Sequence, residues 1–308
     1  MTFRGPTFPL VSRRRLVGLA FGAMHGARRG TGSDIAASRP YRAGDNPDRI
    51  DWGASARLSS AHAADEFIVR EYFADEAPRV IVAVDRRAAM GLCPPGIPWL
   101  RKDEASRVAA DLVEASVAAA RGFVGRLEFG ARTDVVAWCP PIGASGGGAL
   151  VDHALPDPER TASVGAVGVA LEFLAYHRRA VPAASFVFVI SDFLIAPELE
   201  TWERALDRGW DIVPVVVQDA IWEQGFPDLD RVGVPLVDET GRLRVVRLRR
   251  GESDVWRARH EERYARLLAG LRSLGIEPVL VSTMERASIF EAFLAWSAER
   301  EASWSRGW

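Results

Sequence analysis

The fold depends most on one stretch of sequence, RVIVAVD at residues 79–85. A second stretch of the same kind, SFVFVISD, occupies residues 185–192. Unbroken apolar runs of this length are typical of strands that are buried on both faces of a parallel sheet. Each run ends in an aspartate, Asp85 or Asp192. Because ligands of open α/β sheets bind beyond the carboxyl ends of the strands, these two strand ends are the most suggestive chemical feature of the sequence.

The segments around these two runs alternate between strand and helix patterns. This alternation indicates an α/β fold with an open, mostly parallel central sheet and helices on both faces, as in Rossmann-like proteins. Pro214 predicts a kink or an edge position for its strand. The sequence DETG at 238–241, between two apolar segments, predicts a β-hairpin insertion over 233–248. The other predicted strands are 125–130 and 134–139, which form a hairpin, 211–217 and 276–282, and the predicted helices are 102–121, 161–179, 197–208, 252–274 and 285–299.

The chain divides into three parts on these patterns. Residues 1–75 form the first part. The first 60 residues are rich in Gly, Arg, Ser and Pro, and this composition predicts an irregular N-terminal extension with loops and a short helix around 12–24. Residues 76–299 form the predicted α/β domain, and residues 300–308 form a C-terminal tail. The tail carries Trp304 and Trp308, and two interpretations stay open for it: disorder, or docking onto a partner or the chain's own body.

The composition is that of an ordinary globular protein. The net charge of −2 over 308 residues gives no bulk attraction to nucleic acid. Residues 1–60 hold ten Arg against four Asp, so this segment either meets an acidic partner, folds onto the acidic remainder of the chain or is simply solvated. Lys102 is the only lysine and is interpreted as a codon bias. Two cysteines, Cys93 and Cys139, make neither a zinc site nor a disulfide framework, which favours a reducing, cytoplasmic location.

No apolar run is long enough to cross a bilayer, so we expect no membrane span. The sequence SRRRLVGLAF at 12–21 is similar to a twin-arginine export signal. Its apolar part is short and is followed by His25, Arg28 and Arg29, and no clear cleavage site comes after it. We therefore expect a protein that stays in the cytoplasm.

Asp85 and Asp192, with the neighbouring Ser191, are candidate ligands for Mg²⁺, which prefers oxygen ligands. The stretch Asp85-Arg-Arg-Ala-Ala89 resembles the Asp-x-Ser-x-Ser pattern that follows the first strand of von Willebrand factor type A domains and forms their metal-ion-dependent adhesion site. Arg87 and Ala89 replace the two serines here. Alanine offers no ligand, and arginine repels Mg²⁺. We therefore expect a degenerate site in which Arg87 pairs with Asp85 or Asp192. A threonine ligand could not be placed, although Thr161 and Ser163 lie nearby in the sequence.

The most distinctive stretch of the chain is RPYRAGDNPDRIDWGASAR at residues 39–57. It resembles the signature of the bacterial domain-of-unknown-function family 58. Two interpretations stay open for it: a clamp of ion pairs that involves Asp45 and Asp51 and is anchored by Trp52, or a surface that faces a partner. The residues that carry the resemblance are Arg39, Tyr41, Gly44, Asp45, Arg49, Asp51, Trp52, Ser55 and Arg57.

The resemblance implies a von Willebrand factor type A-like domain and a non-enzymatic adaptor role beside a MoxR-type AAA+ ATPase. No cofactor is expected. Mg²⁺-dependent ligand binding through Asp85 and Asp192 is the first alternative, and a hydrolase of unrecognised type is the second. The hydrolase has little support, because the sequence GASG at 143–146 follows no strand-to-helix elbow and none of the five histidines has the spacing of a metal site or triad. The sequence also lacks a phosphate-binding loop that ends in Lys-Ser or Lys-Thr.

Overall fold

The computed structural model forms two compact units, residues 14–78 and residues 1–13 with 79–308. They are called the N-terminal unit and the sheet unit below. Among the described residues, none of the helices has the length and apolar character needed to cross a membrane. The structure describes residues 5–13, 21–42, 45–62, 66–91, 99–130, 135–143, 151–154, 158–229, 233–237, 243–249 and 251–306.

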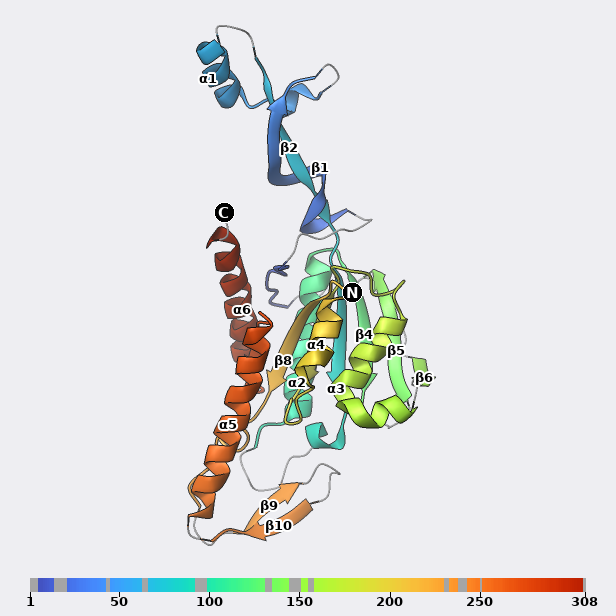
Figure 1. The fold of residues 1–308 in the computed structure, drawn as a ribbon, viewed down its shortest axis with the longest axis vertical. Coiled ribbons are helices and arrows are strands. Elements are labelled where there is room, and N and C mark those ends of the chain that lie inside the picture. Colours follow the sequence, from blue (N-terminus) through green and yellow to red (C-terminus); the bar gives the residue numbers. More distant parts are fainter. Residues whose placement is uncertain are drawn as a thin grey trace. The chain divides into compact units, whose positions relative to one another are not determined.

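The sheet unit is built on a seven-stranded sheet with the strand order β11-β8-β7-β3-β4-β5-β6 (Figure 1). The pairs from β11 to β4 are parallel, and β5 and β6 extend the sheet in antiparallel register. The prediction of an open, mostly parallel α/β sheet is therefore confirmed. The strands are β3 (Arg79–Asp85), β4 (Phe123–Phe129), β5 (Val135–Gly143), β6 (Val151–Ala154), β7 (Phe186–Ser191), β8 (Asp211–Val217) and β11 (Val279–Val281).

Helices cover both faces of this sheet. On one face, α3, α4 and α5 pack over a shared apolar cluster, and on the other face α2 contacts β3, β4, β7 and β8 and is itself contacted by α6. This double cover explains why β3, β7 and β8 show unbroken apolar runs instead of alternation. The helices of the unit are α2 (Lys102–Ala119), α3 (Pro158–Tyr176), α4 (Leu199–Leu206), α5 (Glu252–Ser273) and α6 (Arg286–Arg306), with a short 3₁₀ turn η2 (Ala88–Gly91).

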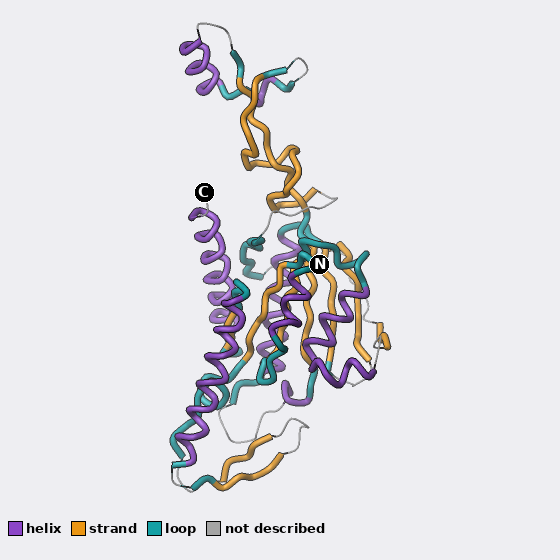
Figure 2. Tube along the Cα trace, viewed as in Figure 1, coloured by secondary structure: helices purple, strands orange, loops and turns teal. Residues whose placement is uncertain are grey.

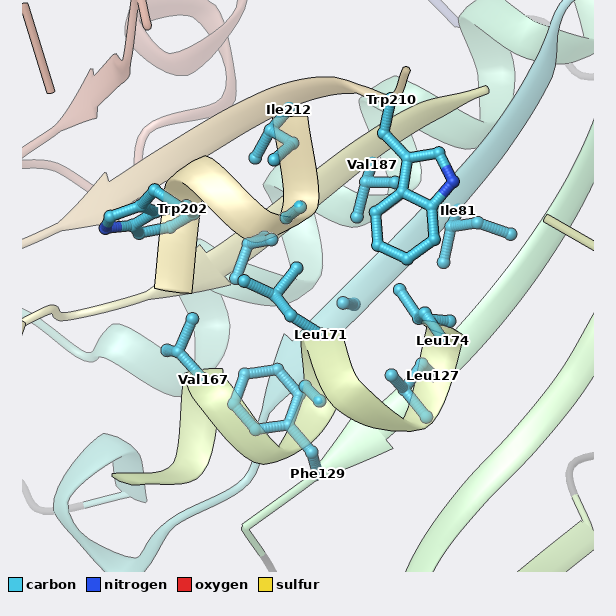
Figure 3. Close-up of a cluster of buried hydrophobic side chains, with 14 of the residues drawn as sticks. Ile81, Leu127, Phe129, Val167, Leu171, Leu174, Val187, Trp202, Trp210 and Ile212 are labelled. Carbon is cyan, nitrogen blue, oxygen red and sulfur yellow. The ribbon is translucent and has the colours of Figure 1, made fainter. Parts of the chain in front are cut away.

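The core under α3 and α4 contains side chains from the neighbouring strands β8, β7, β3, β4 and β5. Ile81 of β3 and Ile212 of β8 meet Leu171 of α3 and Trp202 of α4 (Figure 3). All four side chains are at most 3% exposed. Tight apolar packing on this face fixes the positions of the neighbouring strands, and with them the carboxyl edge of the sheet.

Residues 5–13 belong to the sheet unit, although the sequence placed them in the N-terminal extension. Phe8 stacks on Phe293 of α6 with ring centroids 4.5 Å apart, and its amide donates to Ser116 Oγ of α2 at 3.0 Å. Arg300 of α6 donates to the carbonyl of Val11 at 3.0 Å. Sequence patterns did not reveal these contacts because they join segments that lie between 108 and 289 residues apart in the chain.

The N-terminal unit is a two-stranded antiparallel ribbon of β1 (Phe21–Pro40) and β2 (Ile68–Glu76), with a 3₁₀ turn η1 (Pro47–Arg49) and a helix α1 (Trp52–His62) between the strands. The expectation of loops, and of a helix reaching residue 24, is therefore wrong. The strand β1 lacks apolar alternation and is rich in glycine, so it carries none of the usual strand signals. Its pairing with β2 is interrupted by several register shifts. The residues between Arg13 and Phe21 lie outside the description.

Three smaller predictions have clear outcomes. The hairpin insertion is confirmed as the antiparallel pair β9 (Gly233–Val237) and β10 (Leu243–Arg247), which Figure 2 shows as a separate ribbon. The edge position predicted from Pro214 is wrong, since β8 lies between β7 and β11. Pairing with β11 starts only at Val215, however, so Pro214 has a ladder neighbour on the β7 side alone. The expected tail begins inside α6, which continues to Arg306.

Candidate functional site

The carboxyl edge of the sheet brings Asp85 and Asp192 together. Asp85 ends β3, and Asp192 directly follows β7, the neighbouring parallel strand. Both residues are buried, at 1% and 0% exposure. Ser191, which is also fully buried, donates its hydroxyl to Asp85 Oδ2 at 2.7 Å. Charged carboxylates at this depth need partners that neutralise them.

Arg87 is the first of these partners. Its Nε and Nη2 atoms donate to Asp85 Oδ2 at 2.8 and 2.6 Å, and its amide donates to Asp85 Oδ1 at 2.9 Å. The same Nη2 donates to Asp192 Oδ1 at 2.8 Å. One guanidinium thus bridges the two strand-end carboxylates, as the sequence predicted. Such charge-assisted, forked contacts are among the strongest hydrogen bonds in proteins.

A glycine on the neighbouring strand end makes room for this guanidinium. Gly130 follows β4 and has a φ of +81°, a conformation that glycine adopts without strain. A Cβ atom on Gly130 would lie 2.6 Å from Cγ of Arg87 and 3.1 Å from Oδ1 of Asp85. The backbone of three consecutive sheet strands is therefore shaped around the ion pair.

Lys102 is the second partner, and sequence reasoning missed it. Its ammonium donates to Asp192 Oδ2 at 2.9 Å and to Glu223 Oε1 at 2.7 Å. Lys102 is 2% exposed although it is the first residue of α2, a position at which the helix dipole disfavours a cation. The signal in the sequence was that the only lysine stands in a chain with 38 arginines, which the codon-bias interpretation dismissed.

Electrostatics keep Asp192 and Lys102 charged. Burial opposes the charge of Asp192, but Lys102 and Arg87 outweigh burial and hold the pKa of this carboxyl below its ordinary value. Burial likewise opposes the charge of Lys102, and Asp192 and Glu223 outweigh it and raise the pKa of the ammonium. For Glu223, burial dominates and raises the pKa despite Lys102. Asp192 is therefore the firm carboxylate partner of Lys102.

The segment after β8 forms a second layer behind Lys102. Gln218 donates from Nε2 to the carbonyl of Asp192 at 2.5 Å. Asp219 accepts the amide of Leu100, just before α2, at 2.7 Å, and its own amide donates to Glu223 Oε2 at 2.9 Å. Arg263 of α5 donates to the carbonyl of Glu223. The network thus connects the carboxyl ends of β3, β7 and β8 with the start of α2 and the middle of α5.

The donor set does not fit a divalent metal ion. Arg87 already donates to both aspartates and Lys102 donates to Asp192 as well, and Mg²⁺ would have to displace these cations. Ala89, half-buried in η2, supplies no ligand. No cluster of three or more Asp, Glu, His or Cys side chains capable of holding a metal occurs in the part of the chain that the structure describes. The side chains of Thr161 and Ser163 lie outside the description, as do Ser145 and Cys93.

The motif at 39–57 lies in the N-terminal unit and is held by two ion pairs. Arg39 donates from Nη1 and Nη2 to the two oxygens of Asp45, both at 2.7 Å, and these bonds hold the pKa of Asp45 at about 2. Asp51 directly precedes α1 and accepts the amide of Ala54 at 3.0 Å, the arrangement of a helix N-cap. Its other oxygen accepts Nε of Arg70, a residue outside the motif, at 2.9 Å.

The remaining motif residues have different positions. Ser55 is buried and joins α1 to β2, because its hydroxyl donates to the carbonyl of Asp51 at 2.6 Å and accepts the amide of Ile68 at 2.8 Å. Arg57 is exposed, and Arg49 ends η1. Gly44 lies outside the described residues. The expectation that Trp52 anchors the motif by burial is wrong, since its side chain is 64% exposed.

Fold and site together define a class of protein. Its members have an open α/β sheet and a separate two-stranded ribbon unit, and here the two aspartates at the strand ends are neutralised by Arg87 and Lys102 of the same chain. Residues 37–267 match the model of the family described as Protein of unknown function DUF58. Because this match covers well over half of the chain, the protein belongs to that family.

Two solved structures are similar to this chain. The conserved hypothetical protein BatB from Bacteroides thetaiotaomicron is 18% identical, with 72% of this chain and 99% of that chain covered and a TM-score of 0.34. An aerotolerance-related membrane protein from Bacteroides fragilis NCTC 9343, with multiple mutations to serines, is 15% identical, with the same coverage of 72% and 99% and a TM-score of 0.33. No curated protein matches the chain.

Proposed function

We propose that this protein is a non-enzymatic interaction module that works without a metal ion. The bridging of Asp85 and Asp192 by Arg87, together with the contact of Lys102 with Asp192, carries this proposal, because the chain itself supplies the two positive charges at the strand ends. In this interpretation the site is a degenerate metal-ion-dependent adhesion site of a von Willebrand factor type A-like domain. Its network holds the carboxyl edge of the sheet together.

The geometry of Ser191 argues against hydrolytic chemistry at this edge. A serine nucleophile needs a base to accept its proton and an open path to a substrate. The hydroxyl of Ser191 donates to Asp85 instead, and the residue is 0% exposed. Its neighbour Arg87 also points a donor at it, with Nη2 at 3.4 Å. This geometry favours a structural role for the hydroxyl.

The proposed partner is a MoxR-type AAA+ ATPase, on the resemblance of the motif at 39–57, and the proposed location is the cytoplasm. A cytoplasmic location suits the free, buried thiol of Cys139, whose pKa is raised by burial and which is therefore poorly reactive. Mg²⁺-dependent binding through Asp85 and Asp192 is less well supported, because both carboxylates are engaged by cations.

Metal independence is tested by thermal melting of the full chain in EDTA and then in millimolar Mg²⁺ or Mn²⁺. A ligand that binds the native state raises the melting temperature by mass action. We expect no shift for the natural protein, nor for an Arg87→Ser/Ala89→Ser variant, because Lys102 still occupies Asp192 in that variant. A rise in the natural protein would overturn the proposal.

The partner is tested by pull-down of a MoxR-type ATPase on the immobilised chain, with EDTA in one arm and Mg²⁺ in the other. The nucleotide is omitted from both arms, so that the metal acts only on this chain. We expect equal capture in the two arms. Capture that EDTA abolishes would contradict the metal independence, and no capture in either arm would contradict the choice of partner.

A further inference from the structure

A pocket of about 350 Å³ lies between α3 and α4 on the sheet unit, and it is called the α3–α4 pocket below. Its walls come from the second half of α3, from α4 and from the turns that follow these two helices. Trp210, which lines it, directly precedes β8, so the pocket reaches the amino end of the sheet, whereas Asp85 and Asp192 lie at the carboxyl edge. Protein sites for small molecules have volumes of about 300–1,000 Å³. The α3–α4 pocket therefore has the size for one small ligand.

The floor of the pocket is apolar and is fixed by the core. Leu171, Ala205 and Trp210 line it and are each at most 5% exposed. Trp210 donates from Nε1 to the carbonyl of Val181 at 3.2 Å, which holds the indole in place, and Figure 3 shows it with Leu171 in the core cluster. The wall carries Tyr176, whose side chain is 59% exposed. An apolar ligand body therefore meets a surface that needs little ordering when it binds.

Positive charge predominates among the lining side chains. They include three arginines, Arg178, Arg204 and Arg208, against one carboxylate, Glu172. Glu172 contacts Arg204, at 3.8 Å. In the part of the chain that the structure describes, the side chains of Arg178 and Arg208 have neither an ion pair nor a hydrogen bond, and the hydroxyl of Thr201, which is 5% exposed, donates to no residue. Two guanidinium groups and one hydroxyl are thus available to a ligand.

The acidic residues of α4 do not cancel this charge, because they lie on another face of the helix. Thr201, Arg204 and Arg208 line the pocket at successive spacings of three and four residues, which places them on one helical face. Glu203 and Asp207 each stand one position before an arginine, so their side chains project from α4 at about 100° to that face. The potential inside the pocket is therefore positive and favours an anion.

Capping of the helix does not account for Arg208. A cation near the C-terminus of a helix often hydrogen-bonds the last carbonyl groups. Backbone amides take this role at the end of α4. The amide of Arg208 donates to the carbonyl of Ala205 at 3.2 Å, and the amide of Gly209 donates to the carbonyl of Leu206 at 2.8 Å. The guanidinium of Arg208 is not engaged by these carbonyls.

We propose that the α3–α4 pocket binds a small organic anion, whose apolar body covers Leu171 and Trp210 and whose carboxylate, sulfonate or phosphate group meets Arg178 and Arg208. A planar guanidinium matches each of these anionic groups through paired hydrogen bonds. The volume of the pocket favours a small molecule over a peptide segment, which needs a longer groove. This inference goes beyond the proposed function, and it does not depend on the identity of the protein partner.

The test is fluorescence titration of the full chain with anilinonaphthalenesulfonate, an aromatic sulfonate, and with phenylnaphthylamine, which has a similar aromatic body and no charge. Both probes become fluorescent in apolar surroundings. Arg178→Met and Arg208→Met should each weaken binding of the sulfonate by about fivefold and leave binding of the uncharged probe unchanged. The matched control is Arg179→Met, because Arg179 is exposed and follows Arg178 directly but does not line the pocket. We expect no change in this control.

A filling variant locates the site. Ala175 lines the pocket, and Ala175→Phe should place a ring in it and abolish binding of both probes. Melting curves verify that the variants are folded. The two arginine variants change exposed positions, so they still test the proposal if Ala175→Phe does not fold.

Several outcomes would overturn the proposal. Natural protein that does not bind the sulfonate, or folded Ala175→Phe that binds it equally well, would exclude this pocket as the site. Arginine variants that bind the sulfonate as the natural protein does, or that lose both probes equally, would contradict an anionic ligand. Displacement of the bound sulfonate by a peptide of glutamates but not by naphthalenesulfonate would identify an acidic peptide as the occupant in place of a small molecule.

Discussion

The two units of the molecule distribute their side chains in opposite ways. At the carboxyl edge of the sheet, Asp192 and Lys102 are charged and at most 2% exposed, whereas on the N-terminal unit the apolar ring of Trp52 is 64% exposed. Burying a charge and exposing a large ring both cost free energy unless a partner compensates. The buried charges find their partners inside the chain. Trp52 has an edge-on ring contact with Phe67 in the described part of the chain, and most of its side chain stays exposed.

The largest effect should come from breaking the buried network at Lys102. Lys102→Met removes the cation, which leaves Glu223 without its ammonium partner and Asp192 with Arg87 as its remaining cation. Removal of one member of a buried ion pair costs about 3–5 kcal/mol of unfolding free energy, because a buried charge remains uncompensated. Urea unfolding monitored by circular dichroism measures this loss. Arg101→Met is the matched control, since Arg101 is the preceding residue and its side chain is 53% exposed. We expect the control to change stability by less than about 1 kcal/mol.

A second substitution locates the cost of Lys102→Met. In the Lys102→Met background, Glu223→Gln removes the carboxylate that has lost its ammonium partner. Part of the unfolding free energy lost in Lys102→Met should therefore return. A double variant that is as unstable as the sum of its single changes would show that Lys102 and Glu223 do not interact energetically. That result would contradict the network, although the 2.7 Å contact between them would remain.

A smaller effect should appear when the pH is lowered. The pKa values of the two carboxylates that share Lys102 are shifted in opposite directions, so acid changes their contributions to stability in opposite directions. The pKa of Asp192 is lowered in the folded protein, so its contribution is complete above the unfolded value of 3.8 and is lost as the pH falls below it. The pKa of Glu223 is raised, so the folded state binds its proton more tightly and acid favours folding at this position. Unfolding free energies between about pH 7 and pH 3 compare the two.

Matched amide variants separate these contributions. Asp192→Asn should be less stable than the natural protein at neutral pH, and its stability should fall less on acidification. Glu223→Gln should lose more stability on acidification than the natural protein, because the proton that the folded state binds at Glu223 no longer offsets the loss at Asp192. Asp192→Asn and the natural protein could instead lose the same stability on acidification. That result would mean that the pKa of Asp192 is not lowered in the folded protein, and it would contradict the assignment of Asp192 as the firm partner of Lys102.

Part of this site followed from the sequence. Strand-end aspartates on buried parallel strands could be placed at one edge because chain direction alone fixes where such strands end. The pairing of Arg87 with them followed from its short distance along the chain from Asp85. Lys102 and Glu223 could not be placed, because Lys102 contacts Asp192 across 90 residues and Glu223 across 121 residues, and no local pattern encodes such distances.

The fold shows the same division. Apolar runs predicted β3, β7 and β8 because their side chains are buried on both sides of the sheet. The ribbon of β1 and β2 was missed because it has no second layer to bury an apolar face against, so its strands need no alternation. The motif at 39–57 was recognised, but the exposure of Trp52 was not foreseen. Whether a tryptophan packs inward depends on tertiary context, which the motif does not specify.

The smallest expected effect is the loss of stability in Trp52→Ala. It is measured beside Trp202→Ala, because the two tryptophans lie in different units and differ in burial. Trp52→Ala should change the unfolding free energy by less than about 1 kcal/mol, since only an edge-on contact with Phe67 is lost. Trp202→Ala, at 1% exposure in the core under α4, should cost about 3–5 kcal/mol through the cavity it leaves. Urea unfolding of both variants measures the difference. A loss for Trp52→Ala as large as that for Trp202→Ala would mean that the indole packs within the chain, which would contradict its exposure of 64%.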